Sequence, residues 1–254
     1  MNIYRSLGLI FATSAAACAA PTLNEADDPN EHPASSTQAI LNGSPADPAK
    51  TGMVVLKAPS GGCSGALLNN MWVITAKHCT LDLPMPSALI VMLGDERLSY
   101  ADSIYPHPDT DVALVKLQFP LEMNGKSTGY KRAISTVPGD QLIGFPLFCY
   151  GYGLPNFPTL RVGLMQITGI TSDATYRVES FGRTNDALMV AGDSGGVCMG
   201  WDGAIVSVQS LLFQLPNLEY EQQVRMDALA TWIARTMTHR VRPCSPPWCG
   251  NGSH

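Results

Sequence analysis

The stretch Val190-Ala-Gly-Asp-Ser-Gly-Gly-Val197 of this 254-residue chain indicates both its fold and its chemistry. It places Ser194 between glycines and directly after Asp193. Glycines adopt backbone conformations that a Cβ forbids, and they let a carbonyl group come close to main-chain N–H groups. The stretch therefore favours an exposed serine nucleophile on a tight turn. Because a serine hydroxyl is inert by itself, the rest of the chain must supply a base and a group that orients the base.

The composition is typical of a globular chain, with 45% apolar and 15% charged residues. A chain of this length forms one large β domain or two lobes. The net charge of −5 is concentrated before residue 40, where several Asp and Glu residues occur. The nearly neutral remainder argues against nucleic-acid binding, which needs clustered Lys and Arg. We expect a monomer with no nucleic-acid partner.

The first 19 residues predict a secretory signal peptide, because Arg5 precedes an apolar run that ends in small residues. The run is too short to span a bilayer. Two cleavage sites compete: a cut of the Ala-x-Ala type near residues 17–20, and a bacterial lipoprotein cut that leaves Cys18 for acylation as a lipid anchor. Both predict a secreted or envelope-associated protein, periplasmic or extracellular. Residues 20–39 are acidic and rich in Pro and Asn, so they form a linker or a pro-segment rather than a core.

From residue 53 onward, short apolar runs alternate with turn residues. The first set lies at residues 53–56, 63–68, 72–75, 89–93 and 112–117, and the second at 141–144, 148–152, 163–171, 188–190, 197–199 and 204–212. Runs of this length and spacing favour an all-β barrel or sandwich, with residues 119–138 as the connection between two lobes. A helix is predicted at about residues 225–238, where apolar residues recur with helical spacing.

Two further stretches carry the partners of the serine: Trp72-Val-Ile-Thr-Ala-Lys-His-Cys79 and Asp111-Val-Ala-Leu-Val-Lys-Leu117. Together with the Ser194 turn they give the order His, Asp, Ser, and here the chain resembles the chymotrypsin/trypsin-like serine peptidases, as a secreted member of bacterial type. The resemblance covers about residues 40–238. It implies two six-stranded antiparallel β-barrels, at about residues 40–125 and 135–225, followed by the C-terminal helix.

The resemblance implies a role for each residue of the predicted site. His78 is the general base, Asp111 orients it, and Ser194 attacks the peptide carbonyl. The N–H groups of Gly192 and Ser194 form the oxyanion hole. The implied function is a serine endopeptidase acting on proteins or peptides, with a proteinaceous inhibitor as a further partner. No cofactor and no metal are needed.

The histidine and the aspartate roles have competitors. His107 lies between prolines and reads as a loop residue, and Asp102 and Asp109 are weaker candidates for the acid. The function also has alternatives. The principal one is a catalytically silent binding or regulatory module on a protease fold. An esterase is a third, because Gly192-Asp-Ser-Gly-Gly196 satisfies Gly-x-Ser-x-Gly, but an α/β-hydrolase runs in the order Ser, Asp, His.

Ile40 and Asp193 form a second implied pair. In the family, cleavage before an aliphatic residue frees an ammonium group that pairs with the aspartate before the nucleophile and orders the oxyanion hole. Ile40-Leu-Asn-Gly43 resembles that new N-terminus. Ala39 departs from the pattern, because a trypsin-like activator needs Lys or Arg there. We therefore expect a zymogen that is cleaved after Ala39 by a protease that prefers small residues, or by itself.

Seven cysteines in an exported chain leave one unpaired, and removing Cys18 leaves six. The family implies disulfides Cys63–Cys79 and Cys149–Cys198. In the tail, residues 239–254, a local Cys244–Cys249 loop competes with pairing elsewhere. No Cys-x-x-Cys pair is present and the histidines are scattered, so a metal site is not expected.

Specificity is predicted from the residues around the primary pocket. Leu188, six residues before Ser194, takes the position of the pocket base, so Lys or Arg is not favoured. Ser207, Val208 and Gln209 resemble the segment that pairs with the substrate backbone, and Gln209 would narrow the pocket. A small or medium aliphatic side chain is the expected preference. Glu219, Glu221 or Asp186 would favour a basic residue if one of them reached the pocket.

Overall fold

The computed structural model describes residues 40, 42–94, 97–153, 159–172, 174–181, 187–215 and 218–238, with the backbone alone at 214, 215, 218 and 219. Several predicted features lie outside the described residues: the signal peptide of residues 1–19 with Cys18, the linker of residues 20–39, the tail of residues 239–254 with Cys244 and Cys249, Asp186, and the side chain of Glu219.

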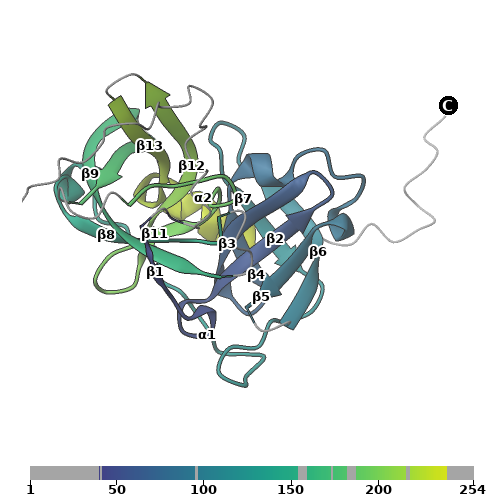
Figure 1. The fold of residues 1–254 in the computed structure, drawn as a ribbon. Coiled ribbons are helices and arrows are strands. Elements are labelled where there is room, and N and C mark those ends of the chain that lie inside the picture. The colour runs from purple at the N-terminus through teal and green to yellow at the C-terminus, as the bar shows by residue number, and fades with distance from the viewer. Residues whose placement is uncertain are drawn as a thin grey trace, which may run out of the picture. The chain divides into compact units, whose positions relative to one another are not determined.

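The first barrel is closed and antiparallel, in the order β2-β3-β4-β7-β6-β5 (Figure 1). Its strands are β2 (Met53–Ala58), β3 (Gly61–Asn69), β4 (Trp72–Thr75), β5 (Ile90–Leu93), β6 (Arg97–Pro106) and β7 (Ala113–Leu117). Five of these match predicted apolar runs. Strand β6 was not predicted, because only Ser99 and Ala101 of its ten residues are buried and its sequence carries no apolar run.

The second barrel closes through antiparallel pairs in the order β9-β10-β13-β12-β11-β8, with β8 back on β9. Its strands are β8 (Pro146–Gly151), β9 (Arg161–Ser172), β10 (Thr175–Ser180), β11 (Val197–Met199), β12 (Ile205–Leu215) and β13 (Leu218–Arg225). The prediction of two six-stranded barrels is confirmed. The short strand β1 (Ser44–Pro45) pairs with β9, so the chain just after Ile40 joins the wall of the second barrel.

The helical elements are short except at the end of the described chain. They are α1 (Pro48–Thr51), the 3-10 helices η1 (Lys77–Thr80), η2 (Pro86–Ala88) and η3 (Gly139–Leu142), and α2 (Met226–Thr238). The strand expected at residues 141–144 is wrong, because η3 begins this segment, and residues 188–190 lie outside the named strands. The C-terminal helix is confirmed as α2. No helix in the described part of the chain is both long and apolar enough to cross a membrane.

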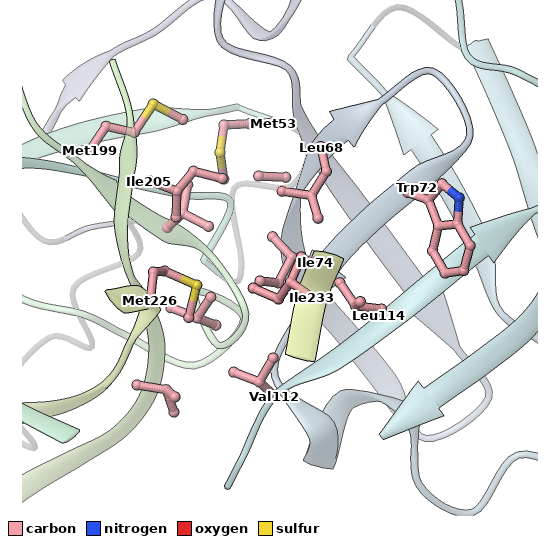
Figure 2. Close-up of a cluster of buried hydrophobic side chains, with 14 of the residues drawn as sticks. Met53, Leu68, Trp72, Ile74, Val112, Leu114, Met199, Ile205, Met226 and Ile233 are labelled. Atoms are coloured by element: carbon pink, nitrogen blue, oxygen red, sulfur yellow. The ribbon is translucent and has the colours of Figure 1, made fainter. Parts of the chain in front are cut away.

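Alternate residues of β2 enter different apolar clusters. Val54 and Leu56 lie in the core of the first barrel, whereas Met53 and Val55 face the opposite way. The cluster that contains Met53 and Val55 also contains residues of β11, β12 and α2, so it joins the two barrels (Figure 2). Because both faces of β2 are buried, its sequence is a continuous apolar run rather than an alternating one.

Candidate active site

The chain reaches His78 at the end of a barrel strand. Strand β4 ends at Thr75, and η1 then carries the exposed His78 and the buried Cys79. Cys79 forms a disulfide with Cys63 of β3, with their Cα atoms 6.1 Å apart. The predicted Cys63–Cys79 pairing is confirmed, and it ties the segment that carries His78 to the neighbouring strand.

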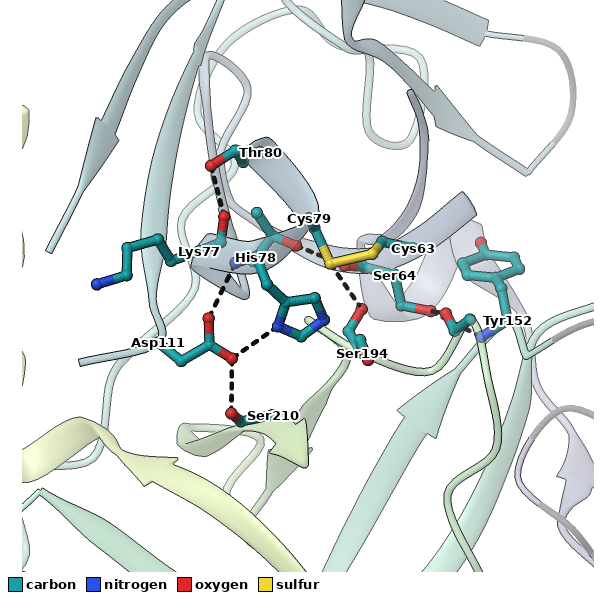
Figure 3. Close-up of a disulfide and its surroundings, with 12 residues drawn as sticks. Cys63, Ser64, Lys77, His78, Cys79, Thr80, Asp111, Tyr152, Ser194 and Ser210 are labelled. Atoms are coloured by element: carbon teal, nitrogen blue, oxygen red, sulfur yellow. Dashed lines mark hydrogen bonds and ion pairs between the residues drawn. A yellow bond between two sulfur atoms is a disulfide. The ribbon is translucent and has the colours of Figure 1, made fainter. Parts of the chain in front are cut away.

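Asp111 binds His78 through both carboxylate oxygens (Figure 3). Oδ2 lies 2.8 Å from His78 Nδ1, and Oδ1 accepts the His78 backbone N–H at 2.9 Å. The carboxylate thus fixes the ring and its backbone together, so that Nδ1 faces the acid. The competing Asp102 instead pairs with Lys116 on the adjacent strand at 3.3 Å.

Ser210 makes a third hydrogen bond to Asp111, and this role was not predicted from the sequence. Its hydroxyl donates to Asp111 Oδ2 at 2.6 Å. Burial alone raises the pKa of Asp111, but hydrogen bonds from the His78 side chain, the Ser210 hydroxyl and the His78 backbone lower it to about 2. Asp111 is therefore a carboxylate at neutral pH and accepts all three hydrogen bonds.

Ser210 reaches Asp111 because β12 is irregular at this point. The pairing of β12 with β13 shifts register between Gln209 and Leu211, which leaves Ser210 without a partner residue. Bulges of this kind re-aim side chains, and they are common beside active sites. A strand periodicity read from the sequence does not predict such a shift.

Ser194 lies on a tight turn that belongs to the second barrel but packs on the first. Asp193 N–H donates to Val190 O at 3.0 Å, and Gly196 N–H donates to Asp193 O at 2.8 Å. Gly195 has φ 81°, and a Cβ there would collide with Thr75 Oγ1 and Ser64 O. Ser64 N–H also donates to Ser194 O at 2.9 Å. The His78 ring consequently lies between Asp111 and Ser194 (Figure 3).

Asp193 is fully buried and accepts three backbone hydrogen bonds. Oδ2 accepts from Ile40 N at 3.0 Å and from Val190 N at 2.9 Å, and Oδ1 accepts from Gly153 N at 2.7 Å. Burial raises the pKa of Asp193 to about 6, although the three N–H donors act in the opposite direction. The structure thus brings Ile40 and Asp193 into contact, and Ile40 enters this contact as a residue within the chain.

A pocket of about 430 Å³ opens beside these residues. His78, Asp111, Ser194 and Ser210 line one part of it. The rest of its lining is apolar and consists of Met189, Val190, Ala191, Leu211 and Leu212. Leu188, the predicted pocket base, is not among the lining residues.

The segment expected to pair with the substrate backbone, Ser207 to Gln209, has an exposed fraction of 0% at each residue. None of the three lines the pocket, including Gln209, whose side chain was expected to narrow it. The backbone of Gln209 supports the serine turn instead, accepting from Gly195 N–H and donating to Gly196 O, each at 2.8 Å. The pocket residues of this strand come next, at Ser210, Leu211 and Leu212.

Glu221 lies behind the pocket wall and has no exposed surface. Its Oε1 accepts from Met189 N–H, and its Oε2 accepts from Gln223 Nε2, each at 2.7 Å. Gln223 Oε1 in turn accepts from the Ser207 hydroxyl at 2.5 Å. The carboxylate supports the pocket wall through the backbone of Met189 and does not line the pocket itself.

The second disulfide joins adjacent strands of the second barrel. Cys149 of β8 faces Cys198 of β11 in the register of the sheet, and their sulfur atoms are bonded. The predicted Cys149–Cys198 pairing is confirmed. Among the described residues, one group has ligand atoms close enough to hold a metal ion, namely Cys63, His78 and Cys79. Its two sulfurs are consumed in a disulfide, so they offer no thiolate.

The chain matches the family model described as Trypsin over residues 40–233. It is 27% identical to a tryptase of Mus musculus over 171 residues, which cover 56% of this chain and 61% of that protein. It is 32% identical to serine protease 1 of Rattus norvegicus over 75 residues, covering 25% of this chain and 30% of that protein, and 32% identical to trypsin of Sus scrofa over 84 residues, covering 29% and 36%. The matches thus span less than two thirds of each relative.

Solved structures share the fold at lower identity. Scabies mite inactivated protease paralogue S-D1 superimposes with a TM-score of 0.68 at 18% identity, covering 80% of this chain and 99% of that chain. Paralogue S-I1 gives a TM-score of 0.64 at 19% identity, covering 77% and 98%. Neuropsin, a serine protease of mouse brain, gives 0.61 at 21% identity, covering 77% and 98%.

Proposed function

The chain belongs to the trypsin family, and from this premise we propose that it is a serine endopeptidase that cleaves peptide bonds through an acyl-enzyme. The observation that carries the proposal is the placement of the His78 ring, bound to Asp111 on one side and facing Ser194 on the other (Figure 3). A nucleophile, a base and an orienting acid within one pocket are the parts that acyl transfer needs.

In the proposed first step, the Ser194 oxygen attacks the substrate carbonyl while His78 Nε2 accepts the hydroxyl proton. His78 then donates this proton to the leaving amine, and a water molecule hydrolyses the ester in the reverse sequence. Asp111 keeps the proton of the neutral ring on Nδ1, which leaves Nε2 free as the base, and its negative charge stabilises the imidazolium. The low pKa of Asp111 supports this role, because the carboxylate stays ionised when His78 becomes charged.

The N–H groups of Gly192 and Ser194 are proposed to bind the developing oxyanion. Within the described part of the chain, neither group donates a backbone hydrogen bond. Gly192 has φ 96°, and its carbonyl oxygen accepts a hydrogen bond from the Ser64 hydroxyl at 2.8 Å, which helps to fix its backbone. One such donor typically contributes about 3 kcal/mol to transition-state stabilisation.

We further propose that the protein is made as a zymogen that is cleaved between Ala39 and Ile40. The support is the contact of Ile40 N with the buried Asp193, which directly precedes the nucleophile. In the uncut chain this nitrogen is a neutral amide. Cleavage would turn it into an ammonium group, whose charge compensates the buried carboxylate and stabilises the oxyanion turn.

For specificity, we propose a small to medium apolar side chain before the scissile bond. The support is the lining of the pocket, because each of its members besides His78, Asp111, Ser194 and Ser210 is apolar. The alternative preference for a basic residue through Glu221 is weaker, because backbone and amide donors occupy that carboxylate behind the wall.

We also propose that the chain is exported. Two disulfides within the folded domain favour an oxidising compartment. The leader of residues 1–19 then directs export, either with removal near residues 17–20 or with acylation of Cys18.

A peptide-library digest tests the proposal. The chain cleaved before Ile40 is expected to hydrolyse peptides after small to medium apolar residues, and Ser194→Ala, which keeps the turn, is expected to hydrolyse none. A profile dominated by Lys or Arg would refute the pocket argument. Absence of hydrolysis by the cleaved chain, in the presence of a normal unfolding transition, would favour the catalytically silent binding module.

A further inference from the structure

The loop of residues 107–112 places Asp111, and it is closed by contacts that the proposed reaction does not use. His107 N–H donates to Val112 O at 2.8 Å, which joins the two ends of the loop. Within the loop, His107 Nδ1 accepts the backbone N–H groups of Asp109 and Thr110, each at 3.2 Å. One imidazole nitrogen thus holds the two residues that directly precede Asp111.

These hydrogen bonds define the protonation state of His107. A backbone N–H can only donate, so Nδ1 must carry a lone pair and the proton of the neutral ring must lie on Nε2. Protonation of Nδ1 would set an N–H group against two other N–H groups. Both hydrogen bonds would then be lost, and the turn before Asp111 would lose its internal support.

The surroundings of His107 connect it to the other parts of the site. From η1, Lys77 Nζ donates to the carbonyl oxygens of His107 at 3.0 Å and Pro108 at 3.4 Å, and Lys77 directly precedes His78. From α2, the uncharged ring of Trp232 packs edge-on against the His107 ring, with centroids 4.8 Å apart. The loop that carries Asp111 is therefore fixed against both the His78 segment and the C-terminal helix.

The charges around the ring favour its neutral form. Burial lowers the pKa of His107, the Asp109 carboxylate acts in the opposite direction, and the Lys77 ammonium lowers the pKa further. Among the described residues, Lys77 and Asp109 are the charged groups that act on the ring, and the residue of α2 that packs against it, Trp232, is uncharged. At neutral pH the imidazole is accordingly able to accept both backbone donors.

We propose that His107 is a positioning residue: its neutral imidazole fixes the turn that places the Asp111 carboxylate against His78, and its protonation releases that carboxylate. The effect on turnover rests on the proposed function, whereas the effect on the Asp111–His78 contact does not. Two variants test whether the hydrogen-bond acceptor at residue 107 places the turn. His107→Asn retains an acceptor oxygen that does not titrate, and His107→Ala has no acceptor.

The first measurement is independent of activity. The proton between His78 Nδ1 and Asp111 gives a separate low-field NMR resonance when the two groups are held at the observed 2.8 Å. We expect this resonance at pH 7 in the wild type and in His107→Asn, and its loss or broadening in His107→Ala. An unchanged resonance in His107→Ala would overturn the inference.

The second measurement is the turnover number per site titrated with a fluorophosphonate. His107→Ala is expected to lower kcat by about 10- to 100-fold with KM within about twofold, because a displaced orienting group impairs the base and not binding. On the acid side of the pH profile, kcat of the wild type should fall with the uptake of two protons, and kcat of His107→Asn with the uptake of one. Fewer titratable sites with unchanged kcat per site would show a purely structural role and overturn the inference. If the wild type hydrolyses nothing, the proposed function fails, and the NMR comparison still decides the inference.

Discussion

The two halves of the candidate site are held by different kinds of contact. The acid–base half, His78 and Asp111, is held largely within the first barrel, by the Cys63–Cys79 disulfide, with a separation of 16 residues, and by a carboxylate 33 residues from its histidine. From the second barrel, Ser210 adds one hydrogen bond to this carboxylate. The nucleophile half depends on Asp193, whose partner Ile40 is 153 residues away. If the proposed function holds, we expect the base to be in place before cleavage of the chain and the serine turn to respond to cleavage.

The largest expected effect comes from the acid–base half. If the proposed function holds, His78→Gln should lower kcat about 10⁴- to 10⁶-fold, as loss of a triad member does in a characterised serine peptidase. Because the ring of His78 is exposed at the pocket mouth, the urea midpoint should stay at the wild-type value. The test is a progress curve on a peptide substrate, and substantial residual turnover would show that His78 is not the general base.

The second prediction concerns the nucleophile half of the uncut chain. The pKa of Asp193 is raised from its ordinary value of 3.8 to about 6, so the folded state favours the protonated acid. Its contribution to stability is complete below about pH 4 and is lost as the pH rises through about 6, a loss of about 3 kcal/mol for a shift of about two units. Urea unfolding between pH 4 and 7 should show this decline in the uncut chain.

Asp193→Asn is the matched control, because it cannot titrate and keeps the size of the side chain. The difference in unfolding free energy between wild type and variant isolates the contribution of Asp193 from that of other groups. Identical pH dependence of the two proteins would contradict the assignment. In the cleaved chain the decline should shrink, because the Ile40 ammonium stabilises the ionised carboxylate.

The third prediction tests the bulge that brings the second barrel to Asp111. Ser210→Ala removes a hydroxyl that donates at 2.6 Å and helps to hold the pKa of Asp111 at about 2. A hydrogen bond to a charged group contributes about 1.5–3 kcal/mol, so kcat/KM should fall about 10- to 100-fold. Ser207→Ala, three residues earlier on the strand, removes a hydroxyl that binds Gln223 and not Asp111, so it should lower the free energy of unfolding and reduce kcat/KM less than Ser210→Ala does. A larger loss for Ser207→Ala than for Ser210→Ala would show that the register described for this strand is incorrect.

The smallest expected effect is a change of specificity. Leu212→Ala enlarges the pocket, so the ratio of kcat/KM for a large apolar residue over a small one should rise about 10-fold, which corresponds to about 1.4 kcal/mol. Leu98→Ala, at an exposed position on β6, is the control and should leave the ratio unchanged. An unaltered ratio in Leu212→Ala would place the substrate side chain elsewhere.

The sequence was informative wherever a short motif carried the chemistry. His78, Asp111 and Ser194 each stand in a motif of a few residues, and the structure brings them to one pocket. The two disulfides of the domain followed from the same resemblance. Apolar runs located most strands, because strands buried on both faces read as continuous apolar segments.

The sequence was less informative where long-range register decides the position of a side chain. Ser207 and Ser210 both read as strand residues, and the bulge after Gln209 determines which of them faces Asp111. Strands β10 and β13 were not predicted. In β13, the polar residues Glu221 and Gln223 are buried and hydrogen-bonded, which the periodicity of the sequence does not predict. His107 read as a simple loop residue, because its bonds to Asp109 and Thr110 depend on the conformation of the loop.

The most direct test of the central claim is the reaction of Ser194 with a fluorophosphonate before and after cleavage at Ile40. The residues before Ile40 are replaced by the recognition sequence of a protease that cuts directly ahead of an isoleucine, and the site of labelling is mapped by mass spectrometry. We predict slow labelling of the uncut chain and rapid labelling of Ser194 alone after the cut. Absence of label on Ser194 in the cleaved, folded chain would contradict the account.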